Sequence, residues 1–301
     1  MKGRIVRNRW LRVDDGDDGG AGRGAGAAPG APALRELWLE APEAAREARP
    51  GQFLHLRLGE EGTPLLRRAL TPVGIDRERG ALRLAVRPGG RALGRLALRG
   101  EGEEVDFLGP LGRPFPLPAE LERPLLVAEG GAWLALWALA EELDRRGLRP
   151  GILLAGEVDA AVEAEIRRLG ALDKVAGGHG PEGRAAALAA AAARAAERIA
   201  EGVDALYAAG SEQLLIALRA AATEARGGAP LPAWAALEGA MACGIGSCLG
   251  CAVLLREGAP GGPRAAGAVR VARLCTEGPV FELERLALGE SWPREEEVAG
   301  A

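Results

Sequence analysis

Aromatic residues are scarce in this sequence. Tryptophan, tyrosine and phenylalanine together make up 4% of the 301 residues, although hydrophobic residues account for 48%. The cores must therefore be built largely from alanine, leucine and valine, and their packing alone indicates little about function. At about 150 residues per domain, the length allows two domains, or three if one of them is small.

The sequence also lacks an excess of positive charge and a long apolar segment. Lysine and arginine number 38 against 42 acidic residues, which gives a net charge of −4. Nucleic acid and anionic membrane surfaces are therefore poor candidate partners. The most apolar run, residues 125–140, is broken by Glu129 and two glycines, and it is shorter than the roughly 20 residues of a membrane helix. No secretory signal precedes it, so we expect a cytoplasmic protein with no membrane partner.

The first third of the chain has the alternating pattern of β-strands. Apolar residues at positions 54, 56 and 58, and again at 82, 84 and 86, alternate with other residues. This pattern predicts an antiparallel β-sheet or β-barrel domain over residues 1–120. Within it, residues 14–32 are rich in glycine, aspartate and alanine, and we interpret them as a flexible hairpin excursion.

The periodicity changes after residue 120. Short apolar runs at 125–127, 151–155 and 205–208 predict buried strands, and they alternate with helical patterns. Ser211 is placed to cap the helix that follows the last of these strands. This order predicts a doubly wound, parallel α/β domain over 121–230. A small domain at 231–290 and a frayed tail at 291–301 complete the chain.

The strongest motif is formed by the four cysteines. Cys243, Cys248, Cys251 and Cys275 follow the spacing C-x4-C-x2-C-x23-C, which is the plant-type spacing of a [2Fe–2S] cluster. Glycines between them allow a loop to fold tightly, adopt positive φ and direct backbone N–H groups at sulfur. Because the fourth cysteine is distant in sequence, a hairpin must bring it back to the others.

Other uses of these cysteines fit the sequence less well. Two disulfides are disfavoured in a chain without a secretion signal, since cytoplasmic thiols stay reduced. Structural zinc stays open as an alternative, although only one C-x2-C pair is present. A Rieske centre is excluded because it needs two histidine ligands, and the two histidines, His55 and His179, lie in other predicted domains. We interpret His55, in a predicted strand, as a structural residue rather than a catalytic base.

The segments around the cysteines resemble a known family. Residues 238–251, EGAMACGIGSCLGC, and 274–281, LCTEGPVF, are similar to the cluster module of the electron-transfer subunit of NAD-dependent dihydroorotate dehydrogenase. The resemblance extends over nearly the whole chain, and the first two modules of that family resemble ferredoxin–NADP reductase. It implies an FAD-binding antiparallel β-barrel, an NAD-binding-like α/β domain and a small ferredoxin-like [2Fe–2S] domain, in this order.

The resemblance also places an FAD site. The family motif Arg-Pro-x-Ser/Thr corresponds here to Arg68, Ala69, Leu70 and Thr71, without the proline. The planar fork of an arginine suits the FAD pyrophosphate, and the threonine hydroxyl suits the isoalloxazine ring. A second family segment, whose glycine N–H groups approach the phosphates, has lost its threonine here. It corresponds to Ala85, Val86, Arg87, Gly89 and Gly90.

The family's nicotinamide site is altered in this sequence. Its glycine-rich turn corresponds to residues 128–136, where Glu129 and Trp133 are expected to bring charge and bulk to the place where a pyrophosphate meets a helix start. The family's Cys-Gly-Pro corresponds to residues 209–211, Ala-Gly-Ser. NAD is therefore in doubt: either it binds through a different loop geometry, or the subunit takes electrons by another route.

The resemblance implies that the chain is the electron-transfer subunit of an oxidoreductase. It would relay electrons between FAD and the FMN-containing catalytic subunit of dihydroorotate dehydrogenase, in a hetero-oligomer, expected to be a heterotetramer. A flavin is required because the cluster carries single electrons whereas organic donors give pairs. No catalytic residue is assigned to this chain, since the pyrimidine chemistry belongs to the partner. The alternatives are a reductase-like subunit of another oxidoreductase, such as a hydrogenase, and a non-catalytic, zinc-binding assembly subunit.

Overall fold

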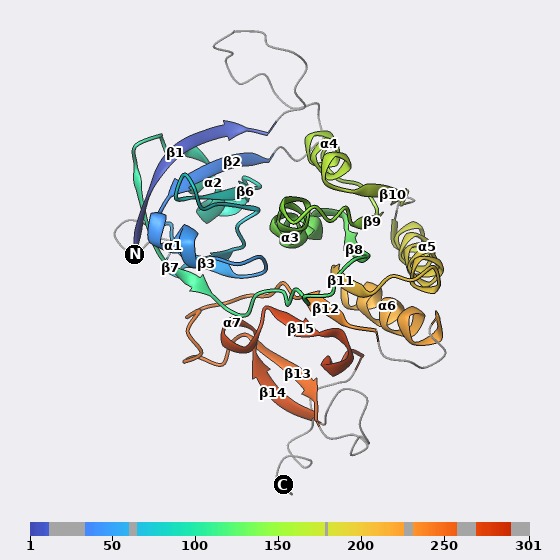
Figure 1. Ribbon diagram of the computed structural model, residues 1–301. Helices are drawn as coiled ribbons and strands as arrows, with labels where there is room; N and C mark the ends of the chain where they lie inside the picture. Colours follow the sequence, from blue (N-terminus) through green and yellow to red (C-terminus); the bar gives the residue numbers. More distant parts are fainter. Residues whose placement is uncertain (12–33, 60–64, 178–179, 226–230, 258–268, 290–301) are drawn as a thin grey trace, which may run out of the picture.

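The computed structural model describes residues 1–11, 34–59, 65–177, 180–225, 231–257 and 269–289 (Figure 1). These residues form a seven-stranded sheet, a six-stranded sheet with helices on both faces, and a two-stranded hairpin. The predicted excursion at 14–32 and the predicted tail at 291–301 lie outside the described residues.

The first domain is an antiparallel sheet with the strand order β4-β3-β7-β1-β2-β6-β5. The antiparallel sheet predicted from the alternating pattern is confirmed. Strands β4 and β5 are its two edges, and no pairing joins them within the described ranges. Two short helices, α1 (Pro42–Glu47) and α2 (Gly90–Leu98), pack against the core of this domain. Its strands are β1 (Lys2–Trp10), β2 (Arg35–Glu40), β3 (Phe53–Arg57), β4 (Arg68–Leu70), β5 (Gly74–Asp76), β6 (Ala81–Val86) and β7 (Glu104–Leu111).

The core of this domain follows the sequence pattern, with one exception. The leucines at 54, 56 and 58 and the apolar residues at 82, 84 and 86 are buried together. The alternation places His55 on the opposite face of β3, where a polar side chain is expected to be exposed, yet His55 is fully buried. Another part of the chain therefore covers that face of β3.

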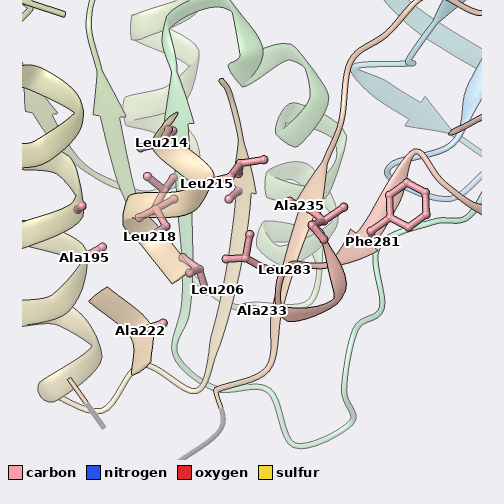
Figure 2. Close-up of a cluster of buried hydrophobic side chains, with 14 of the residues drawn as sticks. Ala195, Leu206, Leu214, Leu215, Leu218, Ala222, Ala233, Ala235, Phe281 and Leu283 are labelled. Atoms are coloured by element: carbon pink, nitrogen blue, oxygen red, sulfur yellow. The ribbon is translucent and has the colours of Figure 1, made fainter. Parts of the chain in front are cut away.

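The second domain is a sheet with the order β10-β9-β8-β11-β12-β15, in which the first five strands are parallel. Helices α3 (Leu134–Arg145) and α4 (Ala160–Leu169) pack on one face, and α5 (Gly180–Ala200) and α6 (Glu212–Ala225) on the other. Figure 2 shows leucines of α6 packed against this second face. The predicted parallel α/β domain is confirmed. Its first four strands are β8 (Pro124–Glu129), β9 (Gly151–Ala155), β10 (Ala171–Val175) and β11 (Ala205–Ala209).

The cysteine-containing segment begins and ends in this same sheet. Strand β12 (Ala233–Ala236) pairs in parallel with β11, and β15 (Val280–Glu282) returns to pair antiparallel with β12. Between them lie the hairpin of β13 (Ala252–Arg256) and β14 (Val269–Arg273), and the short helix α7 (Leu274–Glu277) (Figure 1). No described helix is long and apolar enough to cross a membrane.

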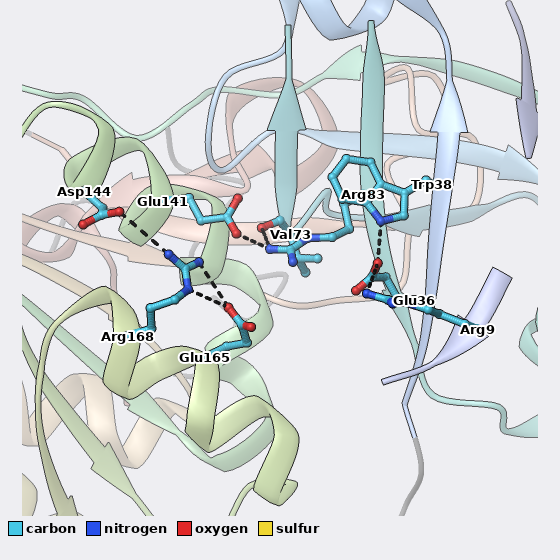
Figure 3. Close-up of polar contacts among 9 residues, drawn as sticks. All are labelled: Arg9, Glu36, Trp38, Val73, Arg83, Glu141, Asp144, Glu165 and Arg168. Carbon is cyan, nitrogen blue, oxygen red and sulfur yellow. Dashed lines mark hydrogen bonds and ion pairs between the residues drawn. The ribbon is translucent and has the colours of Figure 1, made fainter. Parts of the chain in front are cut away.

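A buried arginine joins the first two domains (Figure 3). Arg83 of β6 pairs with the carboxylate of Glu141 on α3, and its guanidinium lies 4.8 Å from the ring centre of Trp137 and 5.8 Å from that of Trp38. It also donates to the carbonyl oxygen of Val73 at 3.4 Å. Burial raises the pKa of Glu141, although the positive charge of Arg83 opposes this shift. The contact fixes β6, which carries part of the proposed FAD segment, against the α/β domain.

Candidate functional site

The four cysteines lie on two segments that the hairpin brings together. Cys243, Cys248 and Cys251 belong to the loop between β12 and β13, and Cys275 lies in α7, directly after β14. The hairpin pairs Ala252 with Arg273, so Cys251 and Cys275 meet with their Sγ atoms 3.3 Å apart. Both of these cysteines are buried, whereas Cys248 is exposed.

The loop backbone favours a thiolate at Cys243. The backbone N–H of Ile245 and that of Cys248 donate hydrogen bonds to its sulfur, the Cys248 thiol adds another, and together they lower the pKa of Cys243 to about 6. Burial, followed by the neighbouring Cys251 thiol, raises the pKa of Cys275 to about 11. The thiols thus form two pairs, Cys243 with Cys248 and Cys251 with Cys275.

Glycine is required at two positions of the loop. Gly244 has φ +71° and Gly246 has φ +83°, which is the left-handed region that favours glycine. A β-carbon on Gly246 would lie 3.0 Å from the side chain of Thr276. On Gly244 it would lie only 2.3 Å from Nδ1 of His55. The tight, positive-φ loop expected from the sequence is present, and it is packed closely against the first domain.

This donor set fits a [2Fe–2S] cluster. Such a cluster takes four thiolates, two on each iron, and the structure supplies two thiol pairs with backbone N–H groups directed at sulfur. Among the described residues, no group of three or more histidine, cysteine, aspartate or glutamate side chains surrounds a single metal position.

A cavity of about 350 Å³ separates the first domain from α3 and from the start of the cysteine loop. Four of the residues proposed for FAD line it: Ala69, Leu70, Thr71 and Ala85. Met241, two residues before the first cysteine, lines it from the other side. The proposed flavin segment and the cysteine loop therefore face the same space.

The other residues proposed for FAD lie outside the lining of this cavity. The Arg68 guanidinium donates to the carbonyl oxygens of Leu66 and Arg67, at 2.9 and 3.1 Å. Val86 is packed in the core of the first domain. Arg87 Nη2 lies 3.5 Å from the position that a β-carbon on Gly131 would take, at the turn that begins the α/β domain. The two remaining glycines lie at the start of α2, Gly89 as its N-cap and Gly90 as its first residue.

Glu238 is a cavity residue that the sequence motifs did not single out. Among the described residues that line the 350 Å³ cavity, it alone has an ionisable side chain. It also lines a second, larger cavity of about 720 Å³. Although Glu238 is an exposed residue, the atoms that surround the two cavities raise the pKa of its carboxyl by partly desolvating it. Its place two residues after β12, beyond the carboxyl end of a parallel strand, was the signal that could have identified it.

The second cavity lies at the altered nicotinamide turn and contains Glu129. The Glu129 carboxylate accepts hydrogen bonds from Arg184 Nε at 2.6 Å and from the backbone N–H of Ser211 at 2.9 Å. Burial opposes its ionisation, but these two partners hold the pKa of Glu129 below its ordinary value. The Ser211 hydroxyl accepts from the Leu214 N–H at 3.4 Å, so the predicted cap of α6 is confirmed.

The expectation that Trp133 obstructs this turn was wrong. Residues 130–133 form a 3₁₀ turn, η1 (Gly130–Trp133), which directs the Trp133 side chain into the core between β8 and α3. The side chain is fully buried there. Of the two residues singled out at this turn, only Glu129 reaches the cavity.

The sequence of this chain is similar to those of known proteins. Residues 238–287 match the family model of the iron–sulfur cluster binding domain of dihydroorotate dehydrogenase B. The dihydroorotate dehydrogenase B (NAD(+)) electron transfer subunit of Geobacillus kaustophilus is 34% identical over 260 residues, which cover 84% of this chain and 92% of that protein. The corresponding subunit of Bacillus caldolyticus is 33% identical over 259 residues, with the same coverage.

Solved structures show the same fold. A structure of the NADH-dependent reduced ferredoxin-NADP oxidoreductase, described for flavin-based electron bifurcation, has a TM-score of 0.64 at 23% identity and covers 99% of this chain and 91% of its own. Ferredoxin-NADP⁺ reductase from Plasmodium falciparum has a TM-score of 0.53 at 11% identity, covering 77% of this chain and 95% of its own. The fold is thus that of ferredoxin reductases with an added iron–sulfur domain. By its identity to the curated relatives over most of its length, the chain belongs to the family of electron-transfer subunits of dihydroorotate dehydrogenase B.

Proposed function

We propose that this chain relays electrons between FAD and the FMN-containing catalytic subunit of a dihydroorotate dehydrogenase through a [2Fe–2S] cluster, in pyrimidine biosynthesis. The observation that carries the proposal is the shared position of Met241. It lines the 350 Å³ cavity together with the proposed flavin segment, and it lies two residues before Cys243. A flavin in this cavity and a cluster on the four cysteines would therefore be neighbours.

The chain's own residues would hold the flavin in the following way. Thr71, at the end of β4, offers a hydroxyl to the ring, and Arg68 offers its guanidinium to the pyrophosphate. Apolar side chains of the lining, among them Phe53, Leu70 and Met241, would contact the ring. When bound, FAD exchanges electron pairs with organic partners and single electrons with a cluster. Glu238, which lines both cavities, would hold a proton between them for use at the flavin.

The catalytic subunit would dock on the exposed side of the cysteine loop. Cys248 is exposed there, and beside it Ile245 and Leu249 leave 57% and 59% of their surface uncovered. Large apolar side chains at this exposure are typical of a binding surface. We propose that this chain and the catalytic subunit form a hetero-oligomer, a heterotetramer, in the cytoplasm, where thiols stay reduced.

The altered turn is less suited to NAD than the 350 Å³ cavity is to FAD. A dinucleotide phosphate needs the free N–H groups of a helix start, and Glu129 already accepts the Ser211 N–H at the start of α6. We therefore propose that NAD exchanges electrons with the flavin slowly in this chain.

The test is anaerobic purification of the chain together with its catalytic subunit. We expect stoichiometric FAD, with two irons and two sulfides per chain, and visible bands that bleach when dihydroorotate is added. Stoichiometric zinc without iron would support the assembly-subunit alternative. If dihydroorotate leaves the flavin and cluster bands unchanged and another oxidoreductase bleaches them, the result supports the alternative partner.

A further inference from the structure

His55 connects the flavin side of the molecule to the cysteine loop. On β3 it pairs across the sheet with Ala69, which lines the proposed flavin cavity. Its Nε2 lies 3.3 Å from the carbonyl oxygen of Met241, which is 186 residues further along the chain. A carbonyl oxygen can only accept, so Nε2 is the protonated nitrogen and donates this hydrogen bond.

The loop is shaped to receive this ring. Gly244 follows the first cysteine, and a β-carbon there would lie 2.3 to 2.9 Å from three ring atoms of His55. The ring is fully buried, and Phe53 meets it edge to face with ring centres 6.3 Å apart. The imidazole therefore contacts the loop on both sides of Cys243, by a hydrogen bond at Met241 and by close packing at Gly244.

We propose that His55 is a positioning residue for electron transfer, which fixes the cysteine loop against the strand beside the flavin and so sets the distance from flavin to cluster. The proposal rests on the proposed function. It requires both properties of the side chain. Phenylalanine would keep a flat ring but lose the donor, which would leave the Met241 carbonyl without its partner. Glutamine would keep an N–H donor but lose the ring beside Gly244.

The experiment uses the full chain with its partner, in the variants His55→Phe and His55→Gln. In His55→Phe we expect the rate of flavin-to-cluster electron transfer to fall about fivefold, which is the effect of one lost neutral hydrogen bond on the population of the docked loop. The cluster's electron paramagnetic resonance signal should shift as well. His55→Gln, which keeps a donor but loses the ring, should restore the rate only in part. Leu56→Ala is the matched control, because it removes a buried side chain of the same strand that faces the core of the first domain.

A second readout does not need the cofactors. In the cluster-free chain, amide hydrogen exchange of residues 241–246 should be about fivefold faster in His55→Phe and unchanged in Leu56→Ala. If His55→Phe has the amide hydrogen exchange, the paramagnetic resonance signal and the electron-transfer rate of the wild type, the inference is overturned.

A double-mutant cycle covers the case in which His55→Phe does not fold. Gly244→Ala should slow electron transfer strongly beside His55, and less in a His55→Ala background, where the added methyl has room. Equal effects in both backgrounds would also overturn the inference. If the wild-type chain lacks FAD or cluster, the proposed function fails; if it holds both and the His55 variants match it, only this inference fails.

Discussion

The Glu129 carboxylate and the backbone N–H of Ser211 are joined by a 2.9 Å hydrogen bond that links the end of β8 to the start of α6. A helix start attracts anions because its N–H groups are unpaired and its dipole end is positive. Here an acidic side chain of the same chain takes that place, and Arg184 holds it there. A dinucleotide would have to displace this carboxylate.

We expect NADH to reduce the bound flavin slowly, and Glu129→Ala to accelerate this reduction about tenfold or more, since the freed N–H becomes available to a phosphate. Anaerobic stopped-flow absorption of the flavin band measures the rate, with dithionite as the positive control. Glu212→Ala removes a charge from the same cavity without freeing that N–H, and should have little effect. Rapid reduction of the wild-type flavin by micromolar NADH would contradict the prediction.

Each change of Cys243, Cys248, Cys251 or Cys275 to serine should lower the iron and sulfide content and leave FAD in place, because each removes one of four thiolates. Ser247→Ala, in the same loop, is the control and should retain the cluster. Metal analysis and visible spectra give the readout. A cysteine variant that keeps the full cluster would remove that residue from the ligand set.

Arg68→Ala should weaken FAD binding about tenfold or more, since charge-assisted hydrogen bonds to the pyrophosphate are lost. The cluster should remain. Arg57→Ala, an exposed change of equal charge at the end of β3, should bind FAD like the wild type. Flavin titration followed by fluorescence distinguishes the two, and equal affinities would show that Arg68 has no part in the site.

The raised pKa of Glu238 predicts a pH-dependent stability. A carboxyl with a higher pKa in the folded state gives stability that is present below its unfolded pKa and is lost as the pH rises through the folded value. Glu238→Gln should therefore melt like the wild type at pH 3.5 to 4 (roughly the unfolded range) and at a higher temperature near pH 8. Glu47→Gln, at a carboxyl outside the lining of both cavities, is the control. A lower melting temperature for Glu238→Gln at pH 8 would reverse the assigned sign.

Arg83→Met should destabilise the chain by about 2 kcal/mol, because it leaves Glu141 without its cation and Val73 without its donor. Urea unfolding, monitored by tryptophan fluorescence, measures the loss. Arg79→Met is the matched control, since the Arg79 side chain is 81% exposed. A midpoint for Arg83→Met equal to that of Arg79→Met would show that the domains are held together by other contacts.

Local features of the fold could be predicted from the sequence. The strands at 151–155 and 205–209 and the helix after Ser211 follow from short apolar runs and a capping residue, which depend on neighbours in sequence. The close approach of Cys251 and Cys275 follows from their spacing and an intervening hairpin.

Features that depend on contacts between residues far apart in sequence could not be predicted from the sequence. His55 has the pattern of an outward-facing strand residue, and only the loop 186 residues away explains its burial. The direction of the Trp133 side chain depends on the 3₁₀ turn, which two consecutive glycines do not reveal. Glu238 has no acidic or basic neighbour in its motif, and only the structure reveals that it lines both cavities.

The return of β15 to β12 makes the iron–sulfur segment inseparable from the α/β domain. A shortened chain that ends near residue 230 would lose β12 and β15 from the six-stranded sheet, leave β11 as a bare sheet edge and uncover the leucines of α6. Such a truncated chain would tend to self-associate. For the same reason, fusing the iron–sulfur segment alone to the end of another protein would transfer β12 and β15 without the sheet that they join. Engineered electron-transfer fusions should instead keep residues 121–289 as one unit.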